Sequence, residues 1–301
     1  MIGARHPAHR PREYADMRPY RIPPGRPTRA LALCAAALVL VAGCASEPSR
    51  DPGSGDGGTR QPVAPPPVGA PFDYQLGGAY PPPKGVRVVV RDHTASPARG
   101  LYNVCYVNAF QAQPHAERDW DADLLLRDGK GRRVYDTDWD EALLDLRTAD
   151  RRDRAARKVN AWIDRCADKG FDAVEPDNYD SYTRAPKGTL TARHARSFLT
   201  LLARHAHRRG LAVAQKNTAE LAPDRERVGL DFAVVEECGR HHECGAFTRW
   251  FGRRLLVVEY DRRGLRVACR DWGDRVSVVR RDLDVAPAGE SGHLRQTCRD
   301  R

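Results

Sequence analysis

Residues 170–182, GFDAVEPDNYDSY, place a short apolar run directly before a group of acids, an amide and aromatic residues. The run Phe171–Glu175 has the length of a buried strand. It follows an amphipathic segment, Asp150–Lys169, that predicts a helix ending at Gly170. A helix that leads into a buried strand with polar residues at its carboxyl end is typical of a parallel α/β sheet.

The same alternation continues on both sides of this stretch. Thr191–Arg209 carries apolar residues at helical spacing and is followed by Gly210, which predicts a second helix. We therefore predict an α/β fold, a single-domain (β/α)8 TIM barrel; an open doubly wound sheet is the structural alternative. The expected strands are Val86–Arg91, Tyr102–Asn108, Ala142–Leu146, Phe171–Glu175, Ala212–Lys216, Phe232–Val235, Leu255–Glu259 and Val276–Val279.

The N-terminal segment has the features of an export signal. Basic residues precede the apolar run Ala30–Cys44, which is too short to span a bilayer as a stable helix. Val41-Ala42-Gly43-Cys44 resembles the bacterial lipoprotein box, in which the cysteine is lipidated after cleavage; an ordinary secretory signal is the alternative. We expect a signal peptide over residues 1–43, lipid on Cys44, a Pro/Gly/Ser-rich tether over 44–71, a catalytic domain over 72–286 and a C-terminal tail over 287–301.

This organisation predicts an exported protein, held by its lipid at the extracytoplasmic face of the cell membrane. The alternative is an intracellular α/β enzyme. The net charge of +10 does not indicate a nucleic-acid partner, because residues 1–43 hold seven arginines against Glu13 and Asp16. In the rest of the chain acidic and basic residues are interleaved. We expect a monomer.

The cysteines agree with an oxidising compartment. Setting aside Cys34 and Cys44 leaves six cysteines, which allow fifteen pairings. Cys238 with Cys244 is the favoured local pair, and Cys105 with Cys166 is a second candidate. A zinc site of Cys238, His241, His242 and Cys244 is the alternative, but its spacing fits no common zinc motif. We expect no cofactor and no metal.

Most of the expected strands end in polar side chains, which a barrel gathers at one rim. A pair of carboxyl groups suits glycoside hydrolysis, because one donates a proton while the other attacks or activates water. Calcium binding by the same acids is the alternative. For contacts with the substrate we expect Gln111, Asp145, Glu175, Asn178, Tyr182, Lys216, Asn217, Glu237 and Tyr260.

Five motifs, in chain order, resemble glycoside hydrolase family 114. They are CYVNAFQAQP, GFDAVEPDNYDSY, LAVAQKNTAEL, FAVVEEC and VVEY, and the resemblance covers about residues 72–286. The resemblance implies a (β/α)8 barrel, an endo-α-1,4-polygalactosaminidase activity, and a catalytic pair made of Asp177 and Glu236. Its implied substrate is α-1,4-linked galactosamine polysaccharide, partly N-acetylated.

We assign Asp177 as the nucleophile and Glu236 as the general acid/base, which predicts retention of configuration. Glu175 and Glu237 are the competing candidates. Glu237 should point to the opposite face if the strand persists past Glu236. The alternative to an enzyme is a catalytically inactive glycan-binding lipoprotein on a TIM-barrel scaffold.

Overall fold

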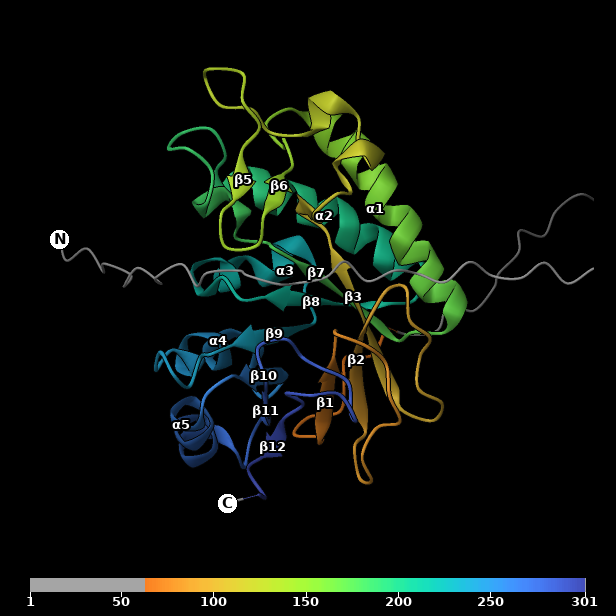
Figure 1. Cartoon of the computed structure of the whole chain (residues 1–301), viewed down its shortest axis with the longest axis vertical. Coiled ribbons are helices and arrows are strands. Elements are labelled where there is room, and N and C mark those ends of the chain that lie inside the picture. The colour runs from red at the N-terminus through yellow and green to blue at the C-terminus, as the bar shows by residue number, and fades with distance from the viewer. Residues whose placement is uncertain (1–62, 301) are drawn as a thin grey trace, which may run out of the picture. The chain divides into compact units, whose positions relative to one another are not determined.

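Nine strands lie side by side in the computed structural model, which describes residues 63–300 (Figure 1). Strands β1 to β11 of this sheet are parallel, and β12 is antiparallel to β11. The sheet curls until β1 lies beside β11, so it is nearly closed, and the predicted (β/α)8 barrel is confirmed. The strands are β1 Phe72–Gln75, β2 Val88–Asp92, β3 Tyr102–Asn108, β7 Ala173–Asp177, β8 Ala212–Lys216, β9 Phe232–Glu236, β10 Leu255–Glu259, β11 Ser277–Arg281 and β12 Arg295–Thr297.

Both predicted helices form, with ends set by local chemistry. The Oγ1 of Thr148 accepts a hydrogen bond from the backbone N–H of Arg151, which caps the start of the first helix. Gly170 closes that helix with a left-handed φ of 88°, a conformation that glycine adopts without strain. The helices are α1 Ala149–Lys169, α2 Ala192–Arg208, α3 Arg225–Val228, α4 Cys244–Phe251 and α5 Arg262–Trp272. No helix within residues 63–300 combines the length and apolar character needed to cross a membrane.

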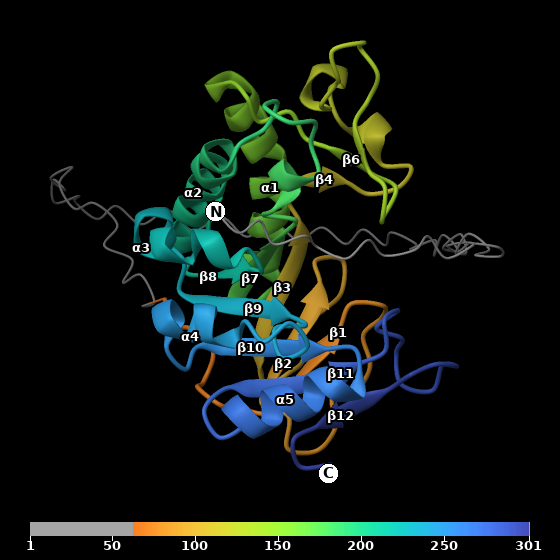
Figure 2. The same ribbon diagram turned by 90° about the vertical axis from the view of Figure 1, so that its left-hand side faces the viewer.

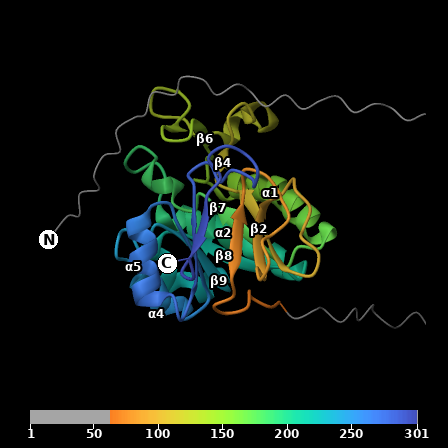
Figure 3. The ribbon, with the colours of Figure 1, turned by 60° about the horizontal axis from the view of Figure 1, so that its bottom comes forward.

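Two apolar layers hold the barrel together, one inside the strands and one outside them. Alternate residues of each strand, such as Val88 and Val90 or Ala212 and Ala214, fill the interior. The residues between them pack outward against the helices, where Val159 of α1 and Phe198 of α2 are fully buried. Figure 3 shows α1 on one side of the strands and α4 and α5 on the other.

The prediction of Ala142–Leu146 as a barrel strand is wrong. Glu141–Leu143 forms β6, which pairs antiparallel with β4 (Gln111–Ala112) and β5 (Tyr135–Asp136) in a separate small sheet. Ala142, Leu143 and Leu144 are apolar because they pack into the outer core, and an apolar run alone does not say which sheet it joins. This excursion, residues 109–147, projects beyond the strands in Figure 2.

Strand β1 is not among the strands expected from the sequence. Phe72 and Tyr74 point into the barrel, while Asp73 and Gln75 face a buried polar network. Asp73 Oδ2 accepts hydrogen bonds from Gln75 Nε2 at 2.9 Å and from the Tyr80 hydroxyl at 2.7 Å. Two of the four residues are polar, so the strand lacks the apolar run by which a buried strand is predicted from a sequence.

The C-terminal residues complete the wall of the barrel. Within the expected tail, Arg295–Thr297 forms β12, and Arg295 Nη2 donates to the Phe72 carbonyl of β1 at 2.9 Å. Arg281 of β11 is fully buried, with Nη1 3.6 Å from Asp73 Oδ1. The predicted signal peptide, the lipidated Cys44 and most of the tether lie outside the described residues.

Candidate active site

The interior positions of neighbouring strands end in polar groups at the carboxyl rim. In β7, Glu175 and Asp177 are two residues apart, so both side chains face the barrel axis. Lys216 ends β8 and Glu236 ends β9. The parallel register sets Asn108 of β3 opposite Asp177, so the rim side chains of β3 and β7 are neighbours.

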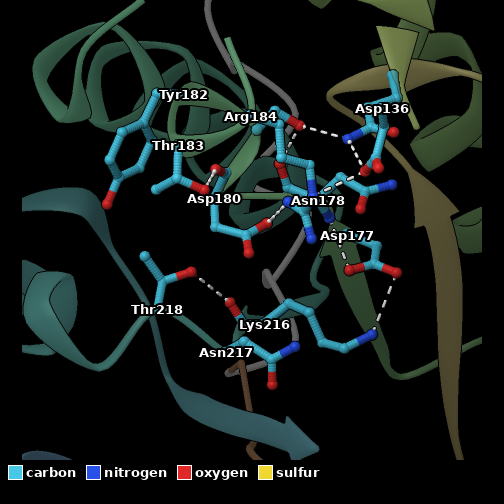
Figure 4. A network of polar contacts seen from close by, with 12 residues as sticks. Asp136, Asp177, Asn178, Asp180, Tyr182, Thr183, Arg184, Lys216, Asn217 and Thr218 are labelled. Atoms are coloured by element: carbon cyan, nitrogen blue, oxygen red, sulfur yellow. Dashed lines mark hydrogen bonds and ion pairs between the residues drawn. The ribbon is translucent and has the colours of Figure 1, made fainter. Parts of the chain in front are cut away.

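The ammonium group of Lys216 is the centre of this arrangement. Its Nζ lies 3.0 Å from Glu175 Oε1, 3.1 Å from Asp177 Oδ2 and 3.3 Å from Glu236 Oε2. It also donates to the Tyr74 hydroxyl at 3.2 Å. Figure 4 shows the side chain of Lys216 extended toward Asp177. Burial acts to lower the pKa of Lys216, but the surrounding carboxylates outweigh it and hold that pKa well above its usual value.

Asp177 is the ionised carboxylate of the rim. Burial acts to raise its pKa, but Lys216 and a hydrogen bond from the backbone N–H of Asn178 at 2.6 Å outweigh burial, so the pKa is lowered. Its side chain is 16% exposed, which leaves it open to a ligand. Asp177 therefore has the charge and the access that a nucleophile needs.

Glu236 is held by partners on both oxygens. The Tyr260 hydroxyl donates to Oε1, and Asn217 Nδ2 donates to Oε2 at 3.2 Å. Asn217 Oδ1 in turn accepts from the backbone N–H of Glu236 at 2.8 Å, which fixes the two residues against each other. The side chain of Glu236 is 24% exposed, so it is also open to a ligand.

Glu175 lies one layer below the rim. It is fully buried, and its Oε1 accepts from the Tyr74 hydroxyl at 2.7 Å. Burial raises the pKa of Glu175 to about 7, although Lys216 opposes that rise. A carboxyl group enclosed in this way supports Lys216 and Tyr74 from beneath and has no surface to offer a sugar.

At the rim, the residue that directly follows each of three neighbouring strands has a left-handed backbone conformation. Asn178 after β7 has φ 65°, Asn217 after β8 has φ 44°, and Glu237 after β9 has φ 55°. Asparagine adopts this conformation readily, but glutamate does so rarely. Such conformations persist at functional sites when the surrounding structure enforces them. Here they turn the chain sharply after Asp177, Lys216 and Glu236, so that these side chains stay at the cleft.

Most predicted contact residues lie at or near this rim, and three do not face its centre. Asp145 is buried in ion pairs with Arg147 and Arg151, at 2.6 Å and 2.8 Å. The Tyr182 hydroxyl donates to Glu220 at 2.6 Å, and Figure 4 shows its ring pointing away from Lys216. Glu237 turns toward Arg240, 3.7 Å away.

Gln111 and Asn178 lie on the side of the rim next to β3, and Gln111 is fully buried. Gln111 Nε2 donates to Asp136 at 3.1 Å and to Ser181 at 2.9 Å. Asn178 Nδ2 donates to Asn108 Oδ1 at 3.1 Å. These amides connect the catalytic rim with the excursion that carries β4 to β6.

Glu141 is a further carboxylate of the site, which the sequence analysis missed. Its Oε2 accepts from Asn108 Nδ2 at 2.8 Å and from Asn178 Nδ2 at 3.2 Å. Burial raises the pKa of Glu141 to about 7, and the charge of Asp177 adds to that rise. Glu141 begins β6, outside every expected strand end, so no sequence signal placed it beside Asp177.

The disulfides support the strand ends. Cys238–Cys244, Cys105–Cys166 and Cys269–Cys298 are bonded, and the first two are the predicted pairs. The sulfurs of Cys238 and Cys244 bind each other, which leaves them unable to act as the thiolate ligands of the zinc alternative. Glu259, buried beneath this loop, accepts from the backbone N–H of Gly239 at 2.6 Å.

A TIM barrel with two accessible carboxyl groups on adjacent strand ends has the architecture of a glycosidase. The family model described as "Glycoside-hydrolase family GH114" matches residues 56–301, and the chain belongs to that family. The prediction of an endo-acting glycosidase of this family is confirmed.

Two solved structures share the fold. Ega3 from Aspergillus fumigatus, in complex with galactosamine, is 21% identical with a TM-score of 0.65, covering 80% of this chain and 100% of its own. The glycoside hydrolase domain of PelA from Pseudomonas aeruginosa is 17% identical with a TM-score of 0.54, covering 73% of this chain and 97% of its own. A search of curated proteins finds no match.

Proposed function

We propose that the protein hydrolyses α-1,4-linked galactosamine polysaccharide from within the chain, with Asp177 and Glu236 as the catalytic pair. The observation that carries this proposal is that both acids, from adjacent strands, contact the ammonium group of Lys216. The crystal structure of Ega3, which has the same fold, contains galactosamine. Polygalactosamine is cationic when its amines are protonated, and the carboxylates Glu141, Asp177 and Glu236 suit such a polymer.

Each acid has a separate role in the proposed mechanism. Asp177 attacks the anomeric carbon while Glu236, in its protonated form, gives its proton to the leaving oxygen. The resulting glycosyl ester of Asp177 is then hydrolysed by a water molecule, whose proton returns to Glu236. Lys216 and the backbone N–H of Asn178 keep Asp177 ionised for the attack.

The spacing of the pair is compatible with retention of configuration. Two oxygens that lie 3.1 Å and 3.3 Å from one nitrogen are at most about 6.4 Å apart. Inverting pairs are separated by ~6.5–9.5 Å and retaining pairs by ~5–5.5 Å. The anomeric form of the first product, read by proton NMR during turnover, tests this: release of the inverted anomer would contradict it.

The test of the activity is release of reducing ends from polygalactosamine. Asp177→Asn and Glu236→Gln should each reduce kcat at least about 1000-fold, because each removes one of the two reacting carboxyl groups. Glu243→Gln, an exposed acid on the loop after β9, is the matched control and should keep full activity. Near wild-type turnover in either catalytic variant would refute the assignment, and binding without release by the wild type would favour the glycan-binding alternative.

We also propose, on the basis of the N-terminal sequence, that the protein is exported and anchored through lipid on Cys44; we expect it to be a monomer. Fractionation of cells that express the wild type and Cys44→Ser tests this proposal. The wild type should remain with membranes and the variant should not. A wild type recovered unprocessed from the cytoplasm would contradict it.

A further inference from the structure

A cavity of about 520 Å³ opens on the outer side of the barrel, between α1 and the segment that follows β2. No helix lies between β2 and β3 in the chain. The segment that begins at His93 packs against α1 instead, and Lys169 Nζ at the end of α1 donates to the His93 carbonyl at 2.6 Å. Figure 1 shows α1 and β2 on the same side of the molecule. We call this cavity the side groove; it is lined by His93, Asn108, Gln111, Trp120, Lys158 and Trp162, among others.

The side groove adjoins the proposed catalytic rim at Asn108. Asn108 lines the groove and also bonds Glu141 and Asn178, which stand beside Asp177. Gln111 lines it too and belongs to the excursion that carries Glu141. A polysaccharide chain bound across Asp177 would reach the groove by passing over Asn108.

Aromatic rings form the inner wall of the groove. The His93 imidazole stacks on the Trp162 indole, with centroids 5.4 Å apart and planes inclined by 17°. The Trp120 ring packs edge to face against the Trp162 ring, with their centroids 5.9 Å apart. Indole and imidazole faces suit the apolar side of a sugar ring or a methyl group.

Within the described part of the chain, one buried amide oxygen of a groove residue lacks a hydrogen-bond donor. The Oε1 of Gln111 is buried and has no hydrogen-bond partner among the residues that the structure describes, although its Nε2 makes two bonds. Buried amide oxygens are nearly always bonded, because an unpaired one loses its hydration without compensation. An amide N–H or a hydroxyl group of a bound sugar would supply that bond.

The charge of the groove differs from that of the catalytic rim. Lys158 Nζ lies 5.1 Å from the centre of the Trp120 ring and 6.0 Å from that of Trp162. A free amine of galactosamine would carry the same charge as this ammonium group and be repelled by it. An N-acetylated amine has no charge, has a methyl group for the indoles and has an N–H for Gln111. Asp119, whose backbone carbonyl bonds Lys158, is an exposed acid at the edge of the groove.

We propose that the side groove is a subsite for N-acetylated galactosamine residues, beside a catalytic rim that takes residues with free amines. This inference rests on the proposed function, and it assigns a preferred acetylation pattern to the substrate. The polymer would be cut where an unacetylated residue at Asp177 is flanked by an acetylated residue in the groove.

The test compares the binding of two hexasaccharides of α-1,4-linked galactosamine, one fully de-N-acetylated and one half N-acetylated. The full-length protein with Asp177→Asn is used so that neither ligand is cleaved, and Kd is measured by calorimetry. Lys158→Glu should shift the ratio of the two Kd values about tenfold toward the de-N-acetylated ligand, because the variant attracts the charge that the lysine repels. Trp162→Ala should weaken binding of the half-acetylated ligand about tenfold.

Arg157→Glu is the matched control, since Arg157 is the exposed neighbour of Lys158 on α1 and does not line the groove. It should leave the ratio of Kd values at its starting value. The inference is overturned if Lys158→Glu and Arg157→Glu give the same ratio, or if the half-acetylated ligand binds Trp162→Ala as tightly as the parent. Cleavage of polygalactosamine by the protein with Asp177 intact, measured in parallel, shows whether the proposed function stands when the subsite does not.

Discussion

The two halves of the barrel are built differently. From β7 to β11, each connection between neighbouring strands includes a helix, and α1 to α5 cover that part of the wall. From β1 to β3 the connections contain no helix, and β3 leads into the excursion of residues 109–147. The regular half supplies the two proposed catalytic acids and Lys216, while the irregular half supplies Glu141 and Gln111; the side groove lies between the irregular half and α1. On the proposed function, the regular half carries the reacting groups, and the irregular half contributes to which sugar is accepted.

The largest effect is expected in the regular half, from Lys216→Met. Without the ammonium group, Asp177 loses its main counter-charge, its pKa rises and it is no longer an effective nucleophile. We expect kcat/KM to fall at least about 1000-fold, with the acidic limb of the pH–rate profile moved to higher pH. Lys216→Arg keeps the charge and should retain part of the activity. An unchanged pH–rate profile in Lys216→Met would contradict this role.

The disulfide Cys105–Cys166 joins the two halves, because it links β3 to α1. Its partners are 61 residues apart, so its removal by a double Cys→Ala substitution should cost about 4 kcal/mol of unfolding free energy. The bridge Cys238–Cys244 spans 6 residues within the regular half, and its removal should cost about 2 kcal/mol. Urea denaturation measures both. Equal costs would show that loop length does not govern the difference.

Glu259 makes the stability of the regular half depend on pH. Burial raises its pKa from 4.5 to about 7, so between these values the folded state keeps a proton that the unfolded state has lost. Its contribution to stability is thus fully present below about pH 4.5 and declines as the pH rises to about 7. Glu259→Gln stays neutral and should gain up to about 3 kcal/mol relative to the wild type between pH 5 and pH 8.

Thermal or urea denaturation of the wild type and Glu259→Gln at both pH values measures this gain. Glu243→Gln, which changes an exposed acid of the same loop, is the control and should follow the wild type. If the difference in stability between Glu259→Gln and the wild type is the same at pH 5 and pH 8, the proton is not held by Glu259.

The smallest effect is expected in the irregular half, from Glu141→Gln. The substitution keeps an oxygen for Asn108 and Asn178 but removes a carboxylate next to Asp177. We expect kcat/KM for de-N-acetylated oligosaccharide to fall about tenfold at pH 8, where Glu141 is ionised, and less at pH 5, where it is protonated. Asp138→Asn, an exposed acid of the same excursion, is the control. Equal losses at the two pH values would exclude an effect of this charge.

The regular half could be predicted from the sequence because its elements follow simple periodicities. Apolar runs of strand length alternate there with amphipathic helices that end at Gly170 and Gly210, and polar residues follow the strands. The irregular half could not. The polar residues of β1 are explained only by partners such as Tyr80 and Arg281, and Glu141 reaches Asn178 only through the pairing of β6 with β4.

The seam between β1 and β11 has a consequence for the order of folding. β12, which follows β11 by more than ten residues, donates to β1 through Arg295, and Cys298 bonds Cys269 of α5. A chain that emerges with its N-terminus first thus carries β1 as an exposed edge strand until some 200 residues have followed it and β11 has formed. During synthesis this edge has no native neighbour on its outer side, which leaves it open to pairing with another molecule.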